Sequence, residues 1–370
     1  MKKENVFVGD LIVDKDSVID YTEVTGYIDV QADVKFPNLK RVGIYVYVRS
    51  NTNLKAPALK TVGGYVEVRG RAELPALKAV GGSVTVWTNS ELKVPSLKIV
   101  GGYVHVLSNS KIKPAALKIV GGSVSAWEGV EFPSIKTVGG TVDVWENVEF
   151  PALKTVVGSI DVWDKAELPA LKIVGGSVNV WANAELPALT TVGGFVSERY
   201  NAVMKSPKEM EFDVPGVEDE CRRELMREFE TEGYLFADGI LSEIVSHHGN
   251  VWRVVVCGET EVSYVVSNGD AYSHGKTLEE ARDSLMYKIS SRDTSKFKTW
   301  TLDRVVSKAE AIEAYRVITG ACEAGVRQWM EQHKTPDQTT VKGIIELTKD
   351  AYGNKEFAEF FRTGKALTPK

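Results

Sequence analysis

The chain has 370 residues, enough for two or three domains, and its apolar and charged fractions of 43% and 26% are those of a globular protein. Its formal net charge is -5, and residues 1–200 are almost balanced, with 22 Lys and Arg against 21 Asp and Glu. This balance provides no strong basic field and therefore argues against nucleic acid as a partner.

The N-terminal segment has two lysines but no apolar stretch behind them, which excludes an ordinary secretory signal. No run of 18 apolar residues occurs, so we expect no transmembrane helix and no membrane partner. The three cysteines, Cys221, Cys257 and Cys322, show no metal-ligand spacing. We expect reduced thiols and a cytoplasmic location.

Residues 24–200 consist of tandem repeats of 18 or 20 residues. The motif VGGSVTVW begins at Val80, and related copies begin at Val24, Val42, Val62, Val100, Val120, Val138, Val156, Val174 and Val192. We number the first valine of each copy as position 1. Positions 5 and 7 are apolar, whereas positions 4, 6 and 8 are polar or aromatic, which predicts a short strand with one buried face. Because a unit this short cannot bury its own core, the repeats predict a solenoid of stacked coils.

Other columns of the repeat predict turns. Positions 2 and 3 are usually Gly-Gly, which indicates a turn that needs positive φ or a close approach of the backbone. Position 10 is asparagine in five copies, and we expect its side chain to hydrogen-bond neighbouring backbone as a ladder: Asn51, Asn89, Asn109, Asn147 and Asn183.

The two ends of such a solenoid need covers, because their edge strands would otherwise be open. Residues 1–23 resemble a degenerate first coil, with VGDLIV at Val8, and are expected to cap one end. Residues 195–215 are expected to cap the other, with 201–215 serving as cap and linker to the second half.

The pattern L-x-x-V-x-x-x-V-x-V-x-x-N, as in LKAVGGSVTVWTN from Leu77, resembles the leucine-rich repeat. More closely, it resembles the receptor L-domain type of growth-factor receptors and fungal cell-wall proteins, although the present coils are shorter and contain no cysteine. The resemblance covers about half of the chain and implies a leucine-rich-repeat-like solenoid, a fold that binds many unrelated partners.

Position 8 should point outward together with positions 4 and 6. Five of the eight tryptophans lie in this column: Trp87, Trp127, Trp145, Trp163 and Trp181. Tyr65 and Tyr103 lie at position 4, and Asp143 and Asp161 lie at position 6 of adjacent copies. Tryptophan is enriched at interface hot spots, so we interpret these nine residues as a partner-binding face. Two alternatives remain, a self-stacked ladder of rings and a stripe covered by the C-terminal domain.

The aspartate pair, Asp143 and Asp161, could share a proton or bind a cation, but a solvated face is the simpler interpretation. His247, His248 and His274 lie near strand ends and match no zinc signature. Gly275-Lys276-Thr277 lacks the remainder of a phosphate-binding loop. We therefore predict no catalytic residues, no metal and no cofactor.

Residues 216–306 are expected to form a small α+β domain and residues 307–370 a helical tail. Glycine turns such as Asn268-Gly269 separate apolar runs, which predicts an antiparallel meander. Its strands are expected at 240–248, 251–257, 261–267 and 271–274. Helices are expected at 217–231, 278–290, 308–333, 341–350 and 355–363. Capping boxes, Thr277 with Glu280 and Ser307 with Glu310, open two of these helices.

Three stretches of this half, SHGKTLEEARDSLMYKISSRDTSKFKTWTLD, YRVITGACEAGVRQW and IIELTKDAYGNKEFAEFF, are similar to segments of uncharacterised phage and gut-bacterial proteins. That similarity carries no known activity. It implies a phage accessory protein that acts on a host component in the host cytoplasm.

The sequence thus predicts a mainly β repeat solenoid followed by a small α+β domain with a helical tail. We expect a non-enzymatic protein that binds a host protein or complex, for example a phage-encoded inhibitor of a host defence or regulatory protein. Homo-oligomerisation through the C-terminal domain is an additional expectation. The alternatives are a structural or adhesive phage or surface component that binds glycan, and an enzyme with its site in residues 216–370. A pocket lined by His247, His274 and Cys257 would favour the enzyme.

Overall fold

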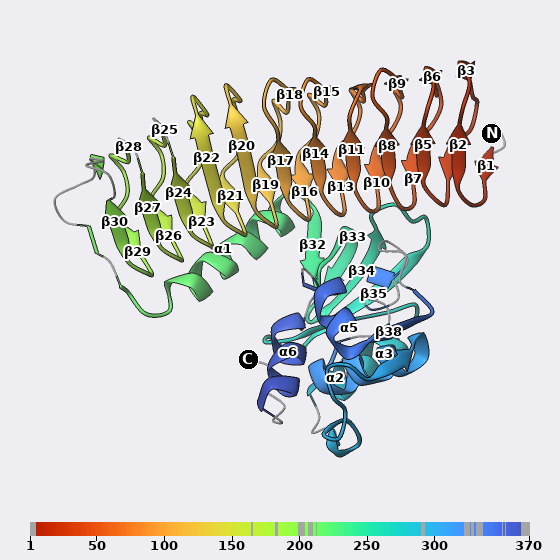
Figure 1. The fold of residues 1–370 in the computed structure, drawn as a ribbon, viewed down its shortest axis with the longest axis vertical. Helices are drawn as coiled ribbons and strands as arrows, with labels where there is room; N and C mark the ends of the chain where they lie inside the picture. Colours follow the sequence, from red (N-terminus) through yellow and green to blue (C-terminus); the bar gives the residue numbers. More distant parts are fainter. Residues whose placement is uncertain are drawn as a thin grey trace. The chain divides into compact units, whose positions relative to one another are not determined.

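A computed structural model describes residues 5–163, 166–181, 184–198, 204–205, 210–211, 213–289, 293–321, 326, 329–330, 336–349, 351 and 353–363 (Figure 1). The chain divides into two compact units, Met1–Tyr234 with Cys257–Glu259, and Leu235–Val256 with Thr260–Lys370. The first unit is a parallel β-solenoid, which confirms the repeat solenoid expected from the sequence. Helix α1 (Val217–Thr231), assigned from the sequence to the second region, lies in the first unit.

The solenoid is built from parallel sheets that run along its length, and each strand pairs with its equivalents in the neighbouring coils. Sheet A contains β1 (Val6–Phe7), β4 (Glu23–Val24), β7 (Arg41–Val42), β10 (Thr61–Val62), β13 (Ala79–Val80), β16 (Ile99–Val100), β19 (Ile119–Val120), β21 (Thr137–Val138), β23 (Thr155–Val156), β26 (Ile173–Val174) and β29 (Thr191–Val192). Sheet B contains β2 (Leu11–Val13), β5 (Ile28–Val30), β8 (Val46–Val48), β11 (Val66–Val68), β14 (Val84–Val86), β17 (Val104–Val106), β20 (Val124–Glu128), β22 (Val142–Glu146), β24 (Ile160–Val162), β27 (Val178–Val180) and β30 (Val196–Glu198).

A further line of short strands closes most coils, and in the two coils of β20 and β22 it is reduced to an isolated bridge between Glu131 and Glu149. In the N-terminal coils it forms sheet C, with β3 (Ser17–Val18), β6 (Val34–Lys35), β9 (Asn53–Lys55), β12 (Arg71–Glu73), β15 (Glu91–Lys93) and β18 (Lys111–Lys113). In the C-terminal coils it forms sheet D, with β25 (Ala166–Glu167), β28 (Ala184–Glu185) and β31 (Met204–Lys205). Most coils therefore contain three strands of a parallel β-solenoid, and the leucine-rich-repeat detail expected from the motif is not confirmed.

Residues 5–20 form a complete additional coil, in which β1, β2 and β3 pair with β4, β5 and β6. The register differs from the expected one. Phe7 pairs with Val24 and is therefore at position 1, which moves Val8 to position 2 and leaves it 82% exposed. At the other end, Glu211 forms a bridge with Thr191, as expected of a capping segment.

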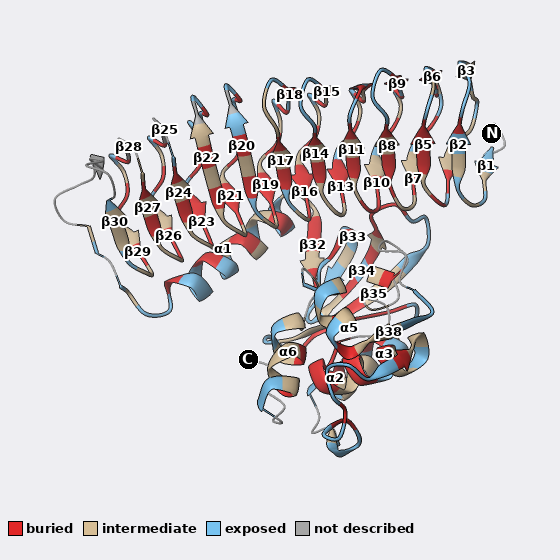
Figure 2. Ribbon diagram, viewed as in Figure 1, coloured by how far each residue is buried: buried red, intermediate tan, exposed pale blue. Residues whose placement is uncertain are grey.

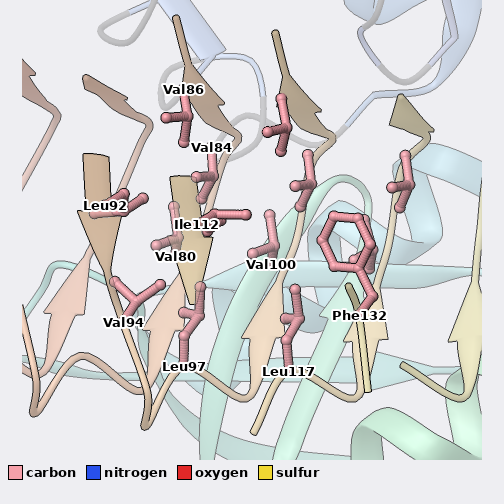
Figure 3. Packing of buried hydrophobic residues seen from close by; sticks show 14 of the residues in the cluster. Val80, Val84, Val86, Leu92, Val94, Leu97, Val100, Ile112, Leu117 and Phe132 are labelled. Atoms are coloured by element: carbon pink, nitrogen blue, oxygen red, sulfur yellow. The ribbon is translucent and has the colours of Figure 1, made fainter. Parts of the chain in front are cut away.

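The core of the solenoid is a continuous apolar column enclosed by the sheets (Figure 2). Positions 5 and 7 point inward, as the period of two predicted, so that Val84 and Val86 are buried and Thr85 between them is half-buried. The four residues that lead back to sheet A in each coil, such as residues 95–98, are called the return segment. Its leucines, such as Leu97 and Leu117, fill the interior from the opposite side (Figure 3). Each coil therefore buries its apolar residues against the coils before and after it.

The Gly-Gly pairs are explained by close approach of the backbone. The described Gly-Gly positions have no positive φ, so the first of the two expected reasons for glycine does not apply. A Cβ atom on Gly63 would lie 2.0 Å from the carbonyl oxygen of Gly43 and 2.7 Å from that of Cys257. On Gly139 it would lie 2.0 Å from the carbonyl oxygen of Gly121 and 2.8 Å from Leu225 Cδ2 of α1. Val157 occupies this position in one coil, so the restriction is not uniform.

The asparagines of position 10 turn the chain at the end of sheet B. Asn51, Asn89, Asn109 and Asn147 have φ between 52° and 62°, the left-handed region that asparagine tolerates better than most residues. Asn183 lies outside the described residues. The expected asparagine ladder is therefore replaced by a conformational role. The ladder that does run from coil to coil belongs to position 4, where Ser83 Oγ accepts a hydrogen bond from the backbone N–H of Tyr103 at 3.1 Å.

The second unit contains sheet E, an antiparallel meander whose strands are β32 (Tyr234–Ala237), β33 (Ile240–His248), β34 (Val251–Val256), β35 (Val262–Ser267) and β36 (Tyr272–Gly275), although Tyr234 itself belongs to the first unit. It also contains α2 (Leu278–Ile289), η1 (Ser295–Phe297), β37 (Val305–Ser307), α3 (Lys308–Thr319), β38 (Gln338–Thr340), α5 (Val341–Leu347) and α6 (Asn354–Thr363). Four strands of the meander and α2 agree with the sequence prediction. The strand β32 was missed, although Asp238 and Gly239, both with positive φ, form the turn after it.

The prediction of one helix over 308–333 is wrong. Helix α3 ends at Thr319 because Gly320 takes a left-handed conformation with φ 75°, a common helix C-terminus. Its start is as predicted, since Ser307 Oγ accepts from the Glu310 N–H and the Glu310 side chain accepts from the Ser307 N–H. The β37–β38 pair beside it was not predicted, because both strands are only three residues long.

Candidate functional site

The outward side of sheet B carries the residues that the sequence analysis proposed for binding. Positions 4, 6 and 8 line it in three parallel columns, because equivalent positions are in register in neighbouring strands. Position 8 is partly open to solvent, with Trp87 38% exposed and Trp127 and Trp163 each 37% exposed. We refer to these three columns as the sheet B face.

Four indoles of the sheet B face form one continuous stack. Trp127 lies over Trp145 with ring centroids 4.6 Å apart, Trp145 over Trp163 at 4.8 Å, and Trp163 over Trp181 at 4.5 Å. The ring planes are within 7° of parallel in all three pairs. The rings therefore stack on one another, as the alternative of a self-stacked ladder predicted. The indole faces within the stack are covered by neighbouring indoles. The stack presents ring edges to solvent.

Arginine continues the column toward the N-terminus. The guanidinium of Arg69 lies 4.2 Å from the ring centroid of Trp87 and 5.5 Å from that of Tyr47, distances typical of a cation–π contact. Arg49 Nε and Nη2 donate to the two carboxylate oxygens of Asp29 at 3.0 Å and 2.9 Å. The hydrogen bonds that Arg49 donates to this buried carboxylate raise the pKa of Arg49 and fix its position. Arg49 and Arg69 are thus held rigidly and remain partly exposed.

Position 4 forms a second, shorter aromatic stack. Tyr45 lies between Tyr27 and Tyr65, with centroid distances of 4.4 Å and 4.5 Å. Burial, together with the nearby Tyr27, Asp10 and Asp29, raises the pKa of Tyr45 to about 12, so its hydroxyl stays protonated at neutral pH. Tyr103 of the same column is 46% exposed and has serine neighbours, so it stands outside this stack.

Asp143 and Asp161 are paired in register on β22 and β24, as the repeat predicted. Burial raises the pKa of Asp143, and Asp161 adds to this, whereas hydrogen bonds from the indole N–H groups of Trp163 and Trp145 lower it. Asp161 Oδ1 accepts from Asn179 Nδ2 at 2.7 Å. The Asp143 carboxylate therefore serves as an acceptor for the indole stack, whereas Asp161 accepts from the amide of the next coil. Within the described residues, no group of three His, Cys, Asp or Glu side chains is placed to hold a metal ion.

Helix α1 covers sheet A of the solenoid and leaves the sheet B face open within the first unit. Its buried residues are four apart, Val217, Cys221, Leu225 and Phe229, and form a single apolar stripe. The helix contacts β19, β21 and β26 of sheet A. Among the described residues of the first unit, no helix packs on the sheet B face.

The residues named for the enzyme alternative do not form one pocket. His247 is exposed and stacks on Trp252 at 4.3 Å. His274 is buried three strands away along the same row of sheet E, through the pairs His247–Trp252, Trp252–Val265 and Val265–His274. Three strand spacings correspond to about 14 Å, so the two imidazoles cannot act on one substrate atom.

A different buried cluster lies in the second unit, and the sequence analysis did not anticipate it. Lys288 Nζ donates to Asp238 Oδ1 at 2.6 Å and to the Tyr272 carbonyl at 3.1 Å. His274 Nδ1 is 4.0 Å from Asp238 Oδ2. Burial lowers the pKa of His274 to about 4, against a smaller opposite effect of Asp238, so the imidazole is neutral at pH 7. Asp238 also lines a small cavity of about 70 Å³ whose walls are mainly apolar, with Tyr315 and Ile344 among them.

One conspicuous column was missed from the sequence, namely the lysine two residues before position 1. It recurs in eight consecutive coils as Lys40, Lys60, Lys78, Lys98, Lys118, Lys136, Lys154 and Lys172. The balanced charge of residues 1–200 concealed it, since acidic residues elsewhere in the coils cancel it in the sum. Alignment of the repeats position by position would have found it.

No protein-family model, curated protein or solved structure matches the chain. Among the described residues, every helix is too short or too polar to span a lipid bilayer.

Proposed function

We propose that the solenoid binds a protein partner through the sheet B face and that this binding, rather than catalysis, is its function. The observation that carries the proposal is the composition and rigidity of that face. Tryptophan, tyrosine and arginine are the residues most enriched at interface hot spots, and here they occupy positions 4 and 8 in adjacent coils.

Rigidity supports the same proposal. The indoles hold one another in place, and Asp29 holds Arg49, so little side-chain freedom is lost when a partner docks. The ring edges and the polar position 6 column offer both apolar and hydrogen-bonding groups, as the centres and rims of protein interfaces do.

The glycan alternative is weaker on this geometry. A sugar ring packs on the open face of an indole, and the faces of Trp145 and Trp163 are covered by their neighbours. A protein surface can use ring edges and a flat polar column, so the protein partner is preferred.

The biological setting of the proposal comes from the sequence resemblances. Similarity of the second half to phage and gut-bacterial proteins favours a phage-encoded inhibitor of a host defence or regulatory protein, acting in the host cytoplasm. The leucine-rich-repeat resemblance favours the same kind of extended recognition surface, and dimerisation through the second unit would increase avidity.

The test uses substitutions that alter the sheet B face without breaking the stack. Thr85 and Ser125 are half-buried at position 6, so Thr85→Arg with Ser125→Arg places two bulky charges on the face. Ser96→Arg with Ala116→Arg adds the same charge to the return segments and serves as the matched control. Affinity capture from bacterial lysate should retain a partner with the wild type and the control and lose it with the face variant.

A further inference from the structure

The lysine column is a continuous, in-register feature of the fold. The backbone N–H of each lysine from Lys60 to Lys172 donates to the carbonyl oxygen of the lysine one coil earlier, at 2.8–2.9 Å. Neighbouring lysines are therefore separated by one strand spacing, about 4.7–4.9 Å, and eight of them span roughly 34 Å. The five exposed members are Lys40, Lys60, Lys78, Lys154 and Lys172, and the three half-buried members are Lys98, Lys118 and Lys136.

Such a column is unfavourable for the solenoid alone. Like charges directly opposite one another on neighbouring strands destabilise a sheet. The neighbouring positions do not offset the positive charge of the column. The return segment supplies small neutral residues such as Ala76 and Ser96, and the position after each lysine supplies residues such as Thr61 and Ile99. Within the described part of the chain, Lys98 and Lys118 are the members of the column that form ion pairs.

These two ion pairs, made to a single carboxylate, show how the column holds an anion. Glu232, just after α1, places its two carboxylate oxygens 3.2 Å from Lys98 Nζ and 2.5 Å from Lys118 Nζ, so one anionic group bridges two consecutive coils. Burial alone would raise the pKa of Glu232, but hydrogen bonds from Lys118 and Lys98 lower it. Among the residues that the structure describes, no carboxylate forms an ion pair with the remaining lysines, which repeat at the same spacing.

We propose that the lysine column binds a linear chain of phosphate groups, recognised by charge and spacing alone. Lysine binds phosphate as a point charge, and each phosphate can bridge two lysines as the Glu232 carboxylate does. The phosphates of one duplex DNA strand are about 3.4 Å apart along the axis, the same scale as the lysine spacing. No aromatic residue flanks the column in the return segment from Pro95 to Lys98 or in its equivalents, so stacking of bases contributes nothing. This activity is independent of the sheet B face.

The experiment measures binding of the full-length protein to two sources of that chemistry, long-chain inorganic polyphosphate and a labelled single-stranded oligothymidylate of about 30 nucleotides, which exceeds the roughly 10 phosphates that the column would span at a spacing of about 3.4 Å. The column variant carries Lys60→Gln, Lys78→Gln, Lys136→Gln and Lys154→Gln. The control carries Lys15→Gln, Lys35→Gln, Lys111→Gln and Lys113→Gln, which makes the same change in net charge at exposed lysines outside the column. A thermal melt of each variant checks that the fold is intact.

We expect the wild type and the control to bind at least one of the two ligands, more weakly as salt rises from 50 to 200 mM, and the column variant to lose about tenfold or more in affinity. Glu232→Gln should tighten binding, because it releases Lys98 and Lys118. Binding of polyphosphate alone would show that the column recognises an inorganic phosphate chain. Binding of both ligands would show that any linear chain of phosphates is sufficient. The proposal is overturned if neither ligand binds at 50 mM salt, or if the column and control variants lose equal affinity.

Discussion

Trp145 and Trp163 lie with their ring centroids 4.8 Å apart and their planes 7° from parallel, so each covers one face of the other. Trp127 covers the remaining face of Trp145 and Trp181 that of Trp163. The two residues that would anchor a partner are therefore also part of the solenoid's own packing. Binding and stability must be separated experimentally.

The first prediction concerns this stack. Trp145→Ala removes two ring pairs and should lower the free energy of unfolding by about 1–3 kcal/mol, whereas Trp145→Phe, which keeps a ring between its neighbours, should cost less than half of that. Urea unfolding measures both. Stacked indoles also couple in the ultraviolet, so the circular dichroism of the wild type should contain an exciton couplet that both variants reduce. Equal stability of wild type and Trp145→Ala would show that the stack contributes nothing to the fold.

A second prediction separates the two roles considered for the position 10 asparagines. Asn89 has φ 62°, so Asn89→Gly should leave stability nearly unchanged, while Asn89→Ala should cost about 1 kcal/mol because alanine resists the left-handed region. The comparison of the two melting temperatures is the measurement. An equal loss in both variants would instead favour the side-chain ladder that the sequence suggested.

The repeat could be predicted from the sequence because the patterns that define it lie within single coils. A period of two placed Val84 and Val86 inside and Trp87 outside, and the spacing of the copies placed equivalent residues side by side. The third strand found in most coils was not predicted, because two or three residues such as Glu91–Lys93 are too short to show a period. The resemblance to leucine-rich repeats rested on the leucine and valine positions, which any solenoid of this size would need for its core.

Contacts between distant residues decided other points that the sequence left open or missed. For Gly63 the sequence offered either positive φ or close backbone approach. The second is correct, because the carbonyl groups of Gly43 and Cys257 lie against it, and Cys257 is almost 200 residues away in the sequence. The end of α3 at Gly320 was masked by the good helix-forming residues that follow it. The tryptophan column was correctly placed on the outside. Whether its rings pack on one another depends on the orientation of the side chains, which the sequence pattern does not specify.

A third prediction concerns pH. His274 is buried and its pKa is lowered from 6.5 to about 4, so the folded protein binds a proton less readily than the unfolded chain. The histidine therefore contributes its full stability above pH 6.5 and loses it progressively as the pH falls toward 4. The loss over that window is of the order of 3 kcal/mol.

The measurement is urea unfolding of the wild type and of His274→Gln at pH 7 and pH 5. Both proteins lose the stability due to other acidic groups equally, so the difference between them isolates His274. The wild type should be destabilised more than the variant at pH 5. Parallel curves for the two proteins would mean that the pKa of the imidazole is the same in the folded and unfolded states, as for a histidine accessible to water.

The central claim is that the sheet B face binds a protein. Its most direct test is the affinity capture from bacterial lysate with the wild type, the Thr85→Arg/Ser125→Arg face variant and the Ser96→Arg/Ala116→Arg control, read by mass spectrometry. Thermal melts of all three proteins should first show that the fold is intact. We predict one protein that is retained by the wild type and the control and lost by the face variant. Retention of that protein by the face variant, or no selective capture by the wild type, would contradict the account.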